Sequence, residues 1–390
     1  MTDLLVKMFV KDYKEIKEPS VRQRYGIMSG IVGIICNIIL CSGKLIAGFI
    51  TGAVSIMADA INNLSDAGSS IITLIGFKLA GKPADSDHPY GHGRLEYIAG
   101  LIVSGIILVM AFELLKSSFI KVIHPEEVTF SLVSVIVLVA SILVKMWMAA
   151  FNNKLGKRIN SVAMLATATD SLSDCIATFV ALASLLLNFL AGINLDGIAG
   201  CVVAIFVLKA GFDAAKDTLQ PLLGQPPSKE YVEKLESIVL EDDNIIGLHD
   251  MMVHDYGPGR TYVSLHAEVS HNMDIMAAHD CIDMAERRVE EKMGCWISIH
   301  MDPVVDDDAS VKELKEMTLE AIKNVGNEIR MHDFRTTQGP LITNLIFDIV
   351  IPYDYRLSDE EVVSRIKEEI KKKDSKCSAV IQVDKGYVGL

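Results

Sequence analysis

Two short segments combine carboxylates and amides with apolar flanks that are long enough to cross a bilayer. The first reads DAINNLSDAGSS over residues 59–70, and the second reads TATDSLSDCIAT over residues 167–178. Residues four apart lie on one face of a helix, so Asn62 would lie beside Asp66, and Asp170 beside Asp174. If the two helices pack together, these four side chains form an oxygen-only site that suits a cation.

The alternative is that these polar side chains cap or hydrogen-bond buried helices. An ionised carboxylate near the centre of a bilayer costs about 2.5 kcal/mol or more, so intramembrane acids usually mark an ion path. Two matching pairs on two segments therefore favour a cation site. Asp59 lies seven residues before Asp66 on roughly the same face. We expect it to contact the ligand residues rather than the cation itself.

The elements that must position these residues are membrane-spanning helices, each of about 20 mainly apolar residues. Six segments qualify, at 27–50, 56–80, 95–120, 128–151, 162–190 and 195–219. Lys and Arg gather before the first segment and after the second and fourth, while the opposite loops have almost none. This asymmetry predicts a multi-pass protein of the cell membrane with both termini in the cytoplasm.

Charge and cysteine content exclude some other functions. The formal charge of −13 argues against a nucleic-acid partner, because phosphate backbones require dense Lys and Arg, and it is compatible with handling cations. The seven cysteines form no CxxC pair and no zinc-finger spacing. Neither a disulfide framework nor a cysteine metal site is therefore expected.

The rest of the chain is charge-rich and follows a break at PLLGQPPSKE. The order helix, strand, strand, helix, strand over residues 228–301 predicts a small α+β domain with two helices on one face of a sheet. The same order then repeats, which predicts a duplicated domain. His249 pairs with His332 at a spacing of 83 residues, whereas His266 pairs with Asp348 and Asp302 with Asp384 at 82.

The sequence resembles the cation diffusion facilitator family of divalent-metal transporters in four features taken together. These are the six spans, the polar pairs on the second and fifth span, the loop DSDHPYGHGRLE and the α+β tail. The resemblance covers residues 24–304. It implies a homodimer that exchanges a divalent metal for protons. The transport site implied is Asn62, Asp66, Asp170 and Asp174.

The resemblance also implies two accessory metal sites. Their matching positions are Asp85, His88 and His92 in the loop, and His249, His266, His279, His300 and Asp302 in the tail. For the loop, a purely structural role is equally favoured. The second tail copy places Asp348 and Gln382 where imidazoles stand in the first, so it has lost that site, changed it to a harder one, or has a structural role.

This chain departs at one position from the pattern of zinc-selective members, and that position bears on which metal is preferred. Zinc-selective members have a His where this chain has Asp170, and carboxylate oxygen suits harder ions such as manganese. The resemblance therefore favours Mn²⁺, with Fe²⁺, Co²⁺ and Zn²⁺ open because affinity order favours the later metals.

The predicted fold is a six-helix transmembrane domain over residues 1–222, followed by ferredoxin-like αββαβ domains over 223–305 and, as a degenerate repeat, 306–390. The predicted function is Mn²⁺/proton antiport out of the cytoplasm, without enzymatic activity. The alternatives are an exporter of Zn²⁺, Fe²⁺ or Co²⁺ in the same family and a membrane metal sensor that moves no ions. A metal-dependent intramembrane hydrolase is weakest, because no HExxH-like motif is present.

Overall fold

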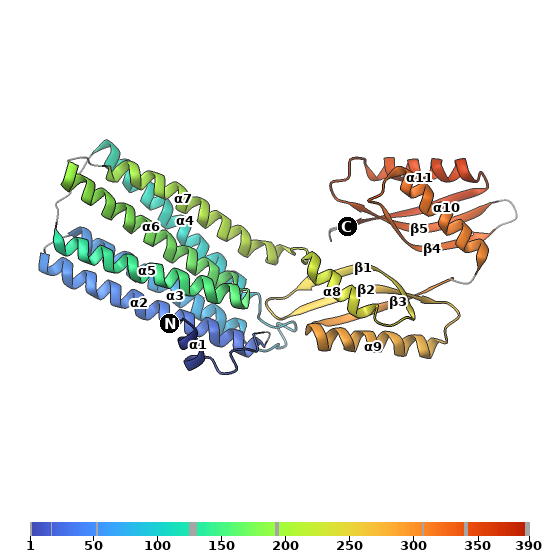
Figure 1. The fold of residues 1–390 in the computed structure, drawn as a ribbon, viewed down its shortest axis with the longest axis horizontal. Coiled ribbons are helices and arrows are strands. Elements are labelled where there is room, and N and C mark those ends of the chain that lie inside the picture. Colours follow the sequence, from blue (N-terminus) through green and yellow to red (C-terminus); the bar gives the residue numbers. More distant parts are fainter. Residues whose placement is uncertain are drawn as a thin grey trace. The chain divides into compact units, whose positions relative to one another are not determined.

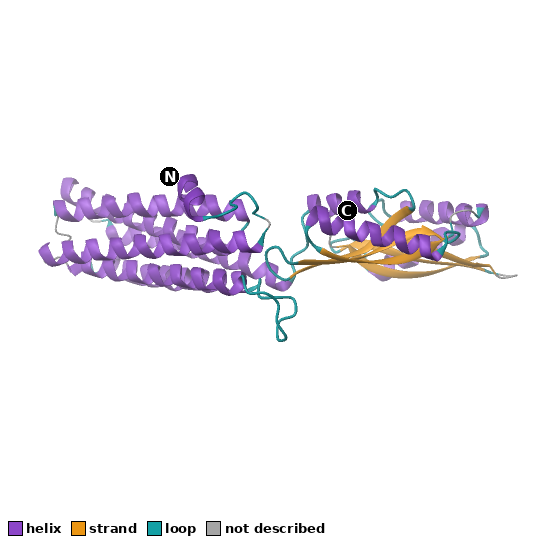
Figure 2. Ribbon diagram, turned by 90° about the horizontal axis from the view of Figure 1, so that it is seen from below, coloured by secondary structure: helices purple, strands orange, loops and turns teal. Residues whose placement is uncertain are grey.

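The computed structural model describes residues 2–16, 18–51, 54–124, 131–191, 195–305, 308–338 and 342–386. The chain divides into two compact units. The first comprises residues 1–225 with the short segment 255–260, and the second comprises 226–254 with 261–390. Helices build the first unit, and the strands gather in the second (Figures 1 and 2).

The first unit is a bundle of long helices. They are α1 (Thr2–Phe9), α2 (Pro19–Thr51), α3 (Val54–Ala80), α4 (Leu95–Ile123), α5 (Leu132–Ile159), α6 (Val162–Ala191) and α7 (Asp196–Leu223). Among the described residues, five helices are long and apolar enough to cross a membrane, namely α2, α4, α5, α6 and α7. The helix α3, which carries the first polar pair, is not among those five, so the sixth span stays a prediction.

Close helix packing places α3 and α6 side by side. α2 packs along α3, α5 packs along α6, and α3 and α6 also contact each other. A Cβ atom on Gly33 of α2 would lie 2.6 Å from the Ser70 hydroxyl oxygen on α3, so any larger residue would force the Ser70 side chain to move. Between α3 and α6, the hydroxyls of Thr73 and Thr167 share a 3.0 Å hydrogen bond in the buried interior. The two helices that carry the acidic pairs are thus fixed against each other.

A buried ion pair connects α2 to α4. The Arg22 Nη2 atom donates to both carboxylate oxygens of Glu96 at 3.3 Å, and both residues are buried. A charged pair out of water is stable only while both partners are present, because either charge alone is uncompensated. This pair therefore fixes one end of the bundle.

Within its described residues, the second unit contains two three-stranded sheets, each with two helices. The first half comprises α8 (Lys229–Val239), β1 (Ile245–Asp255), β2 (Thr261–Ser270), α9 (Ile275–Met293) and β3 (Trp296–Val304). The second half comprises α10 (Ala309–Val325), β4 (Arg330–Gln338), β5 (Thr343–Pro352), α11 (Asp359–Lys373) and β6 (Cys377–Gly386). The strand orders are β1-β2-β3 and β4-β5-β6, and β2–β3 and β5–β6 are both parallel. The element order is the same in both halves; descent from a duplication stays a prediction.

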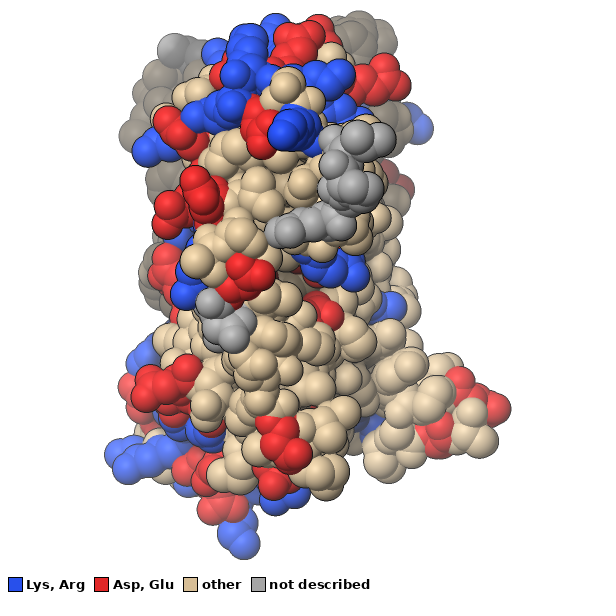
Figure 3. Space-filling view, turned by 90° about the vertical axis from the view of Figure 1, so that its right-hand side faces the viewer, with Lys and Arg blue, Asp and Glu red and all other residues tan. Residues whose placement is uncertain are grey.

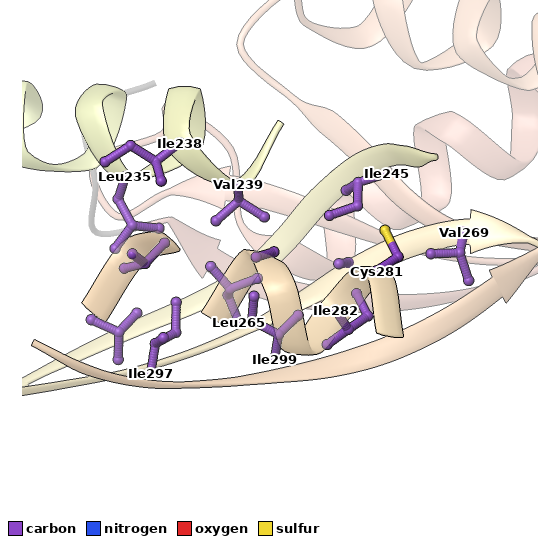
Figure 4. Close-up of a cluster of buried hydrophobic side chains, with 14 of the residues drawn as sticks. Leu235, Ile238, Val239, Ile245, Leu265, Val269, Cys281, Ile282, Ile297 and Ile299 are labelled. Carbon is purple, nitrogen blue, oxygen red and sulfur yellow. The ribbon is translucent and has the colours of Figure 1, made fainter. Parts of the chain in front are cut away.

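Alternation along the strands separates a helix-covered face from a helix-free face in each sheet. Val263, Leu265, Ala267 and Val269 of β2 are buried in one hydrophobic core with residues of α8 and α9. Figure 4 shows Leu265 and Val269 in this core. The intervening residues point to the opposite face, where His266 pairs in register with His300. The helix-free face of this sheet therefore carries polar, metal-capable side chains. On the surface, Lys and Arg side chains lie interspersed with Asp and Glu (Figure 3).

Arg22→Met is expected to lower the free energy of unfolding by about 3 kcal/mol or more, because it leaves the Glu96 carboxylate buried without a counter-charge. The double change Arg22→Met/Glu96→Gln should recover much of that loss. Thermal unfolding in detergent micelles measures both. Arg24→Met is the matched control, because its 4.0 Å pair with Asp12 is exposed. Equal effects of the two arginine changes would contradict the role given to the buried pair.

Candidate metal centre

Three carboxylates meet between α3 and α6. One oxygen from each of Asp66, Asp170 and Asp174 lies within 4.8 Å of the other two. Asp66 is only 3% exposed and Asp170 is also buried, while Asp174 is partly accessible. Three acids this close repel one another in a medium of low dielectric constant, so the cluster requires positive charge.

A lysine from a third helix supplies part of that charge. The Lys145 Nζ atom on α5 donates to Asp66 Oδ2 at 2.6 Å and to Asp174 Oδ2 at 2.7 Å, and the residue is 3% exposed. Sequence reasoning missed Lys145 because it lies in an otherwise apolar segment without a polar neighbour in sequence. The signal that could have found it is general, since any ionisable residue inside a span is a functional candidate.

One acceptor in the cluster has no hydrogen-bond partner. Asp66 uses Oδ2 for Lys145, whereas its buried Oδ1 makes no hydrogen bond to any residue that the structure describes. Leaving a buried carboxylate oxygen unsatisfied costs free energy, and hydrogen bonds to charged groups are among the strongest. This oxygen is therefore available to bind a cation, in a cluster whose negative charge Lys145 neutralises only in part.

The other two residues expected at this site are placed differently. The side chain of Asn62 is exposed, and its neighbour Asn63 is the buried amide, accepting a 2.5 Å hydrogen bond from Lys44 Nζ. The side chain of Asp59 lies outside the described residues. The structure thus brings together three of the four expected transport ligands, and the participation of Asn62 stays a prediction.

The loop between α3 and α4 brings its three candidate ligands together. His88 Nδ1 and His92 Nε2 each lie 3.4 Å from a different oxygen of Asp85. The backbone N–H of His88 donates to Asp85, which lowers the pKa of that carboxyl. His92 Nδ1 lies 3.1 Å from the Pro83 carbonyl oxygen, an arrangement that leaves Nε2 free to bind a metal.

The first tail half gathers most of its candidate ligands at Asp302. His266 Nδ1 lies 2.9 Å from Asp302 Oδ2, and His249 Nε2 lies 3.2 Å from the same oxygen. His300 Nε2 lies 3.4 Å from Asp302 Oδ1, but its side chain is largely exposed. His279 is exposed on α9 and belongs to none of the metal-capable groups among the described residues.

The titration of the tail residues follows from their neighbours. Burial alone would lower the pKa of His249, but the adjacent Asp250 and Asp302 carboxylates outweigh burial and raise it. Interaction with His249 lowers the pKa of Asp250, whereas burial raises the pKa of Asp348. Asp250 is therefore a carboxylate at neutral pH and can serve as an anionic ligand.

The fold and the buried carboxylates define a multi-helix membrane protein with an α+β extension. Residues 30–223 match the family model of the cation efflux transmembrane domain, and residues 227–304 match that of the cation efflux protein cytoplasmic domain. The chain therefore belongs to the cation diffusion facilitator family, whose members are cation efflux transporters. The second of these matches ends at residue 304.

Curated relatives agree with this assignment. An uncharacterized transporter of Methanocaldococcus jannaschii is 35% identical over 260 residues, covering 67% of this chain and 92% of the relative. The manganese efflux system protein MneS of Bacillus subtilis is 29% identical over 299 residues, covering 75% and 98%. The cation-efflux pump FieF of Shewanella oneidensis is 28% identical over 262 residues, covering 67% and 88%.

Lys145→Met is expected to lower the midpoint of thermal unfolding, because it leaves Asp66 and Asp174 without their shared counter-charge. Added Mn²⁺ should raise the midpoint of this variant more than that of the unaltered protein, since a dication can replace the missing ammonium. Differential scanning fluorimetry in detergent measures both. Lys154→Met, which removes an exposed partner of Asp3, is the control and should change neither value. An unchanged midpoint for Lys145→Met would contradict the electrostatic role of Lys145.

Proposed function

We propose that this chain exports a divalent metal cation from the cytoplasm through a six-helix transmembrane domain, with Mn²⁺ as the preferred cargo and protons moving the opposite way. The observation that carries the proposal is the cluster of Asp66, Asp170 and Asp174, buried between two packed helices with one unpartnered oxygen. In this proposal α3 is the sixth span. Its polar residues Asn63, Asp66, Ser69, Ser70 and Thr73 are buried inside the bundle, so the helix can carry them and still cross a bilayer.

The proposed cargo follows from the ligand chemistry. Asp66, Asp170 and Asp174 offer carboxylate oxygens, and Asn62 would add an amide oxygen if its helix rotates or shifts during transport. Such a set favours a hard cation over one that prefers imidazole or thiolate. The name of the Bacillus subtilis relative supports manganese, and the name of the FieF relative leaves other cations open.

Charge balance supplies the reason for exchange. Three ionised carboxylates and one ammonium leave two negative charges, which a divalent cation neutralises. When the cation leaves, the repulsion among the carboxylates favours uptake of protons in its place. We propose that Lys145 holds the empty site together between these states and that the buried Asp66 and Asp170 take up the protons.

The remaining parts have supporting roles in this proposal. Two chains form a homodimer with both termini in the cytoplasm of the cell, and the loop residues Asp85, His88 and His92 bind metal near the membrane surface. The tail site consists of His249, His266, His300 and Asp302, with His279 contributed by a rearranged tail or a partner chain. Metal bound there would shift the equilibrium between the conformational states of the membrane unit. Such a shift requires different metal affinities in the two states of the transporter.

The second candidate function is a membrane metal sensor that binds cations without moving them. The metal-capable groups that cluster in the second unit favour this sensor function specifically. Flux distinguishes the two functions, because both bind metal but only a transporter releases it across the bilayer.

Proteoliposomes loaded with a metal-sensitive dye should show Mn²⁺ entry that an opposing pH gradient accelerates. Asp66→Asn and Asp174→Asn are each expected to reduce the rate at least about 100-fold, by analogy with the loss caused by altering metal-site partners. Asp12→Asn, an exposed acid near the N-terminus, is the control. Metal binding without entry would favour the sensor, and entry indifferent to the pH gradient would refute proton exchange.

Asp170→His is expected to shift the ratio of transport rates from Mn²⁺ towards Zn²⁺, because an imidazole replaces a carboxylate oxygen at the buried site. Competition between the two ions in the same liposomes measures the ratio directly. An unchanged ratio would mean that residue 170 does not set the metal preference.

A further inference from the structure

A cluster of metal-capable side chains crosses from one half of the tail unit to the other. His249 and Asp250 lie on β1 in the first half, and His332 lies on β4 in the second. One ligand atom from each lies within 4.8 Å of the other two. The rings of His249 and His332 stack with their centroids 4.6 Å apart and 28° between their planes. Neither half contains this set of groups alone.

The spacing of the ligand atoms is close to what one ion requires. His249 Nδ1 lies 3.4 Å from Asp250 Oδ2, and His332 Nε2 lies 3.8 Å from Asp250 Oδ1. His332 Nε2 also lies 3.4 Å from Asp384 Oδ2 on β6. A tetrahedral ion with bonds of about 2.0–2.2 Å holds its ligand atoms about 3.3–3.6 Å apart. Small side-chain shifts would therefore suffice to surround a cation.

Both histidines are buried and lack hydrogen bonds. Their side chains are only 6% and 7% exposed, and three of their four ring nitrogens lie 3.2–3.8 Å from carboxylate oxygens, yet none of the four makes a hydrogen bond to any described residue. Asp384 Oδ2 is likewise buried and unsatisfied. Unsatisfied buried polar groups are costly, and so many in one place indicate a missing ligand. A bound cation would use several of these lone pairs at once.

The backbone shows which acid belongs to the cluster. Asp250 and Asp333 each follow the histidine of their half, and both have the left-handed φ that non-glycine residues rarely adopt, 51° and 53°. Such backbone conformations concentrate at functional sites. The two acids then differ, because Arg335 Nη2 holds Asp333 at 2.5 Å, whereas Asp250 extends towards His332. Asp250 is therefore available to the cluster between the halves and Asp333 is not, while each half also has a cluster of its own, His249, His266 and Asp302 in the first and His332, Asp348 and Asp384 in the second.

We propose that His249, Asp250, His332 and Asp384 form a metal site shared between the two tail halves of one chain. Two imidazoles and carboxylate oxygen suit Zn²⁺ or Co²⁺ better than the carboxylate cluster in the membrane does. A cation bound here would fix the two halves to each other without a partner chain. Its ligands all lie in the second unit, so it is separate from the proposed transport site, and it shares His249 with the proposed tail site at Asp302.

Co²⁺ titration of the full chain in detergent micelles tests the proposal through the visible absorption of the bound ion. All proteins carry His88→Ala and His266→Ala, which remove an imidazole from the loop site and from the neighbouring site at Asp302. One absorbing Co²⁺ should still bind per chain. Adding His332→Gln should weaken it by about 100-fold or more, because a direct ligand matters at least as much as its supporting groups. His254→Gln, on an exposed histidine of β1, the strand that carries His249, should change nothing.

A second pair of variants guards against an effect of misfolding. Asp250→Asn should weaken Co²⁺ binding, whereas Asp333→Asn, the equivalent change in the second half, should leave the affinity within about twofold. Unchanged affinity in both His332→Gln and Asp250→Asn would overturn the proposal and assign the ion to the first half alone. Equal losses in Asp250→Asn and Asp333→Asn would also overturn it.

Discussion

The membrane unit depends on the compensation of buried negative charge. Asp66, Asp170 and Asp174 cannot all remain ionised in a medium of low dielectric constant unless positive charge lies among them. Lys145 provides one such charge, at hydrogen-bonding distance from two of the three acids. The site is thus held together by a group that belongs to neither acidic helix, and it retains a deficit that a cation can fill.

The helix packing makes this compensation possible. Asp66 comes from α3, Asp170 and Asp174 come from α6, and Lys145 comes from α5, so the cluster exists only when three helices adjoin. The packing of α5 along α6 and the hydroxyl bond between Thr73 and Thr167 meet that condition. A cation that binds among these residues therefore changes forces between three helices at once. This is the kind of coupling through which cargo could alter the relative stability of two bundle arrangements.

The sequence predicted local relations well and long-range relations poorly. Periodicity placed Asp170 beside Asp174, whereas the contact of their helix with the one that carries Asp66 was only a condition of the predicted site, which the family resemblance also implied. Lys145 was missed because its partners lie 79 and 29 residues away and no pattern near it suggests them. Asn62 shows a different limit of sequence patterns. The i, i+4 rule gives a shared helix face, but neighbouring helices decide which part of that face is buried, and here the adjacent Asn63 is the buried one.

The tail shows the same limit at the level of domains. Spacing aligned His249 with His332 and Asp302 with Asp384, and the shared element order agrees with that alignment. Alignment cannot say whether equivalent residues approach each other, which depends on how two sheets pack. In the structure the two histidines stack. Of the two acids that follow them, Asp333 pairs with Arg335, whereas Asp250 does not. The positively charged Arg335 side chain beside Asp333 distinguishes this acid from Asp250. Two segments of similar sequence therefore need not have equivalent chemistry.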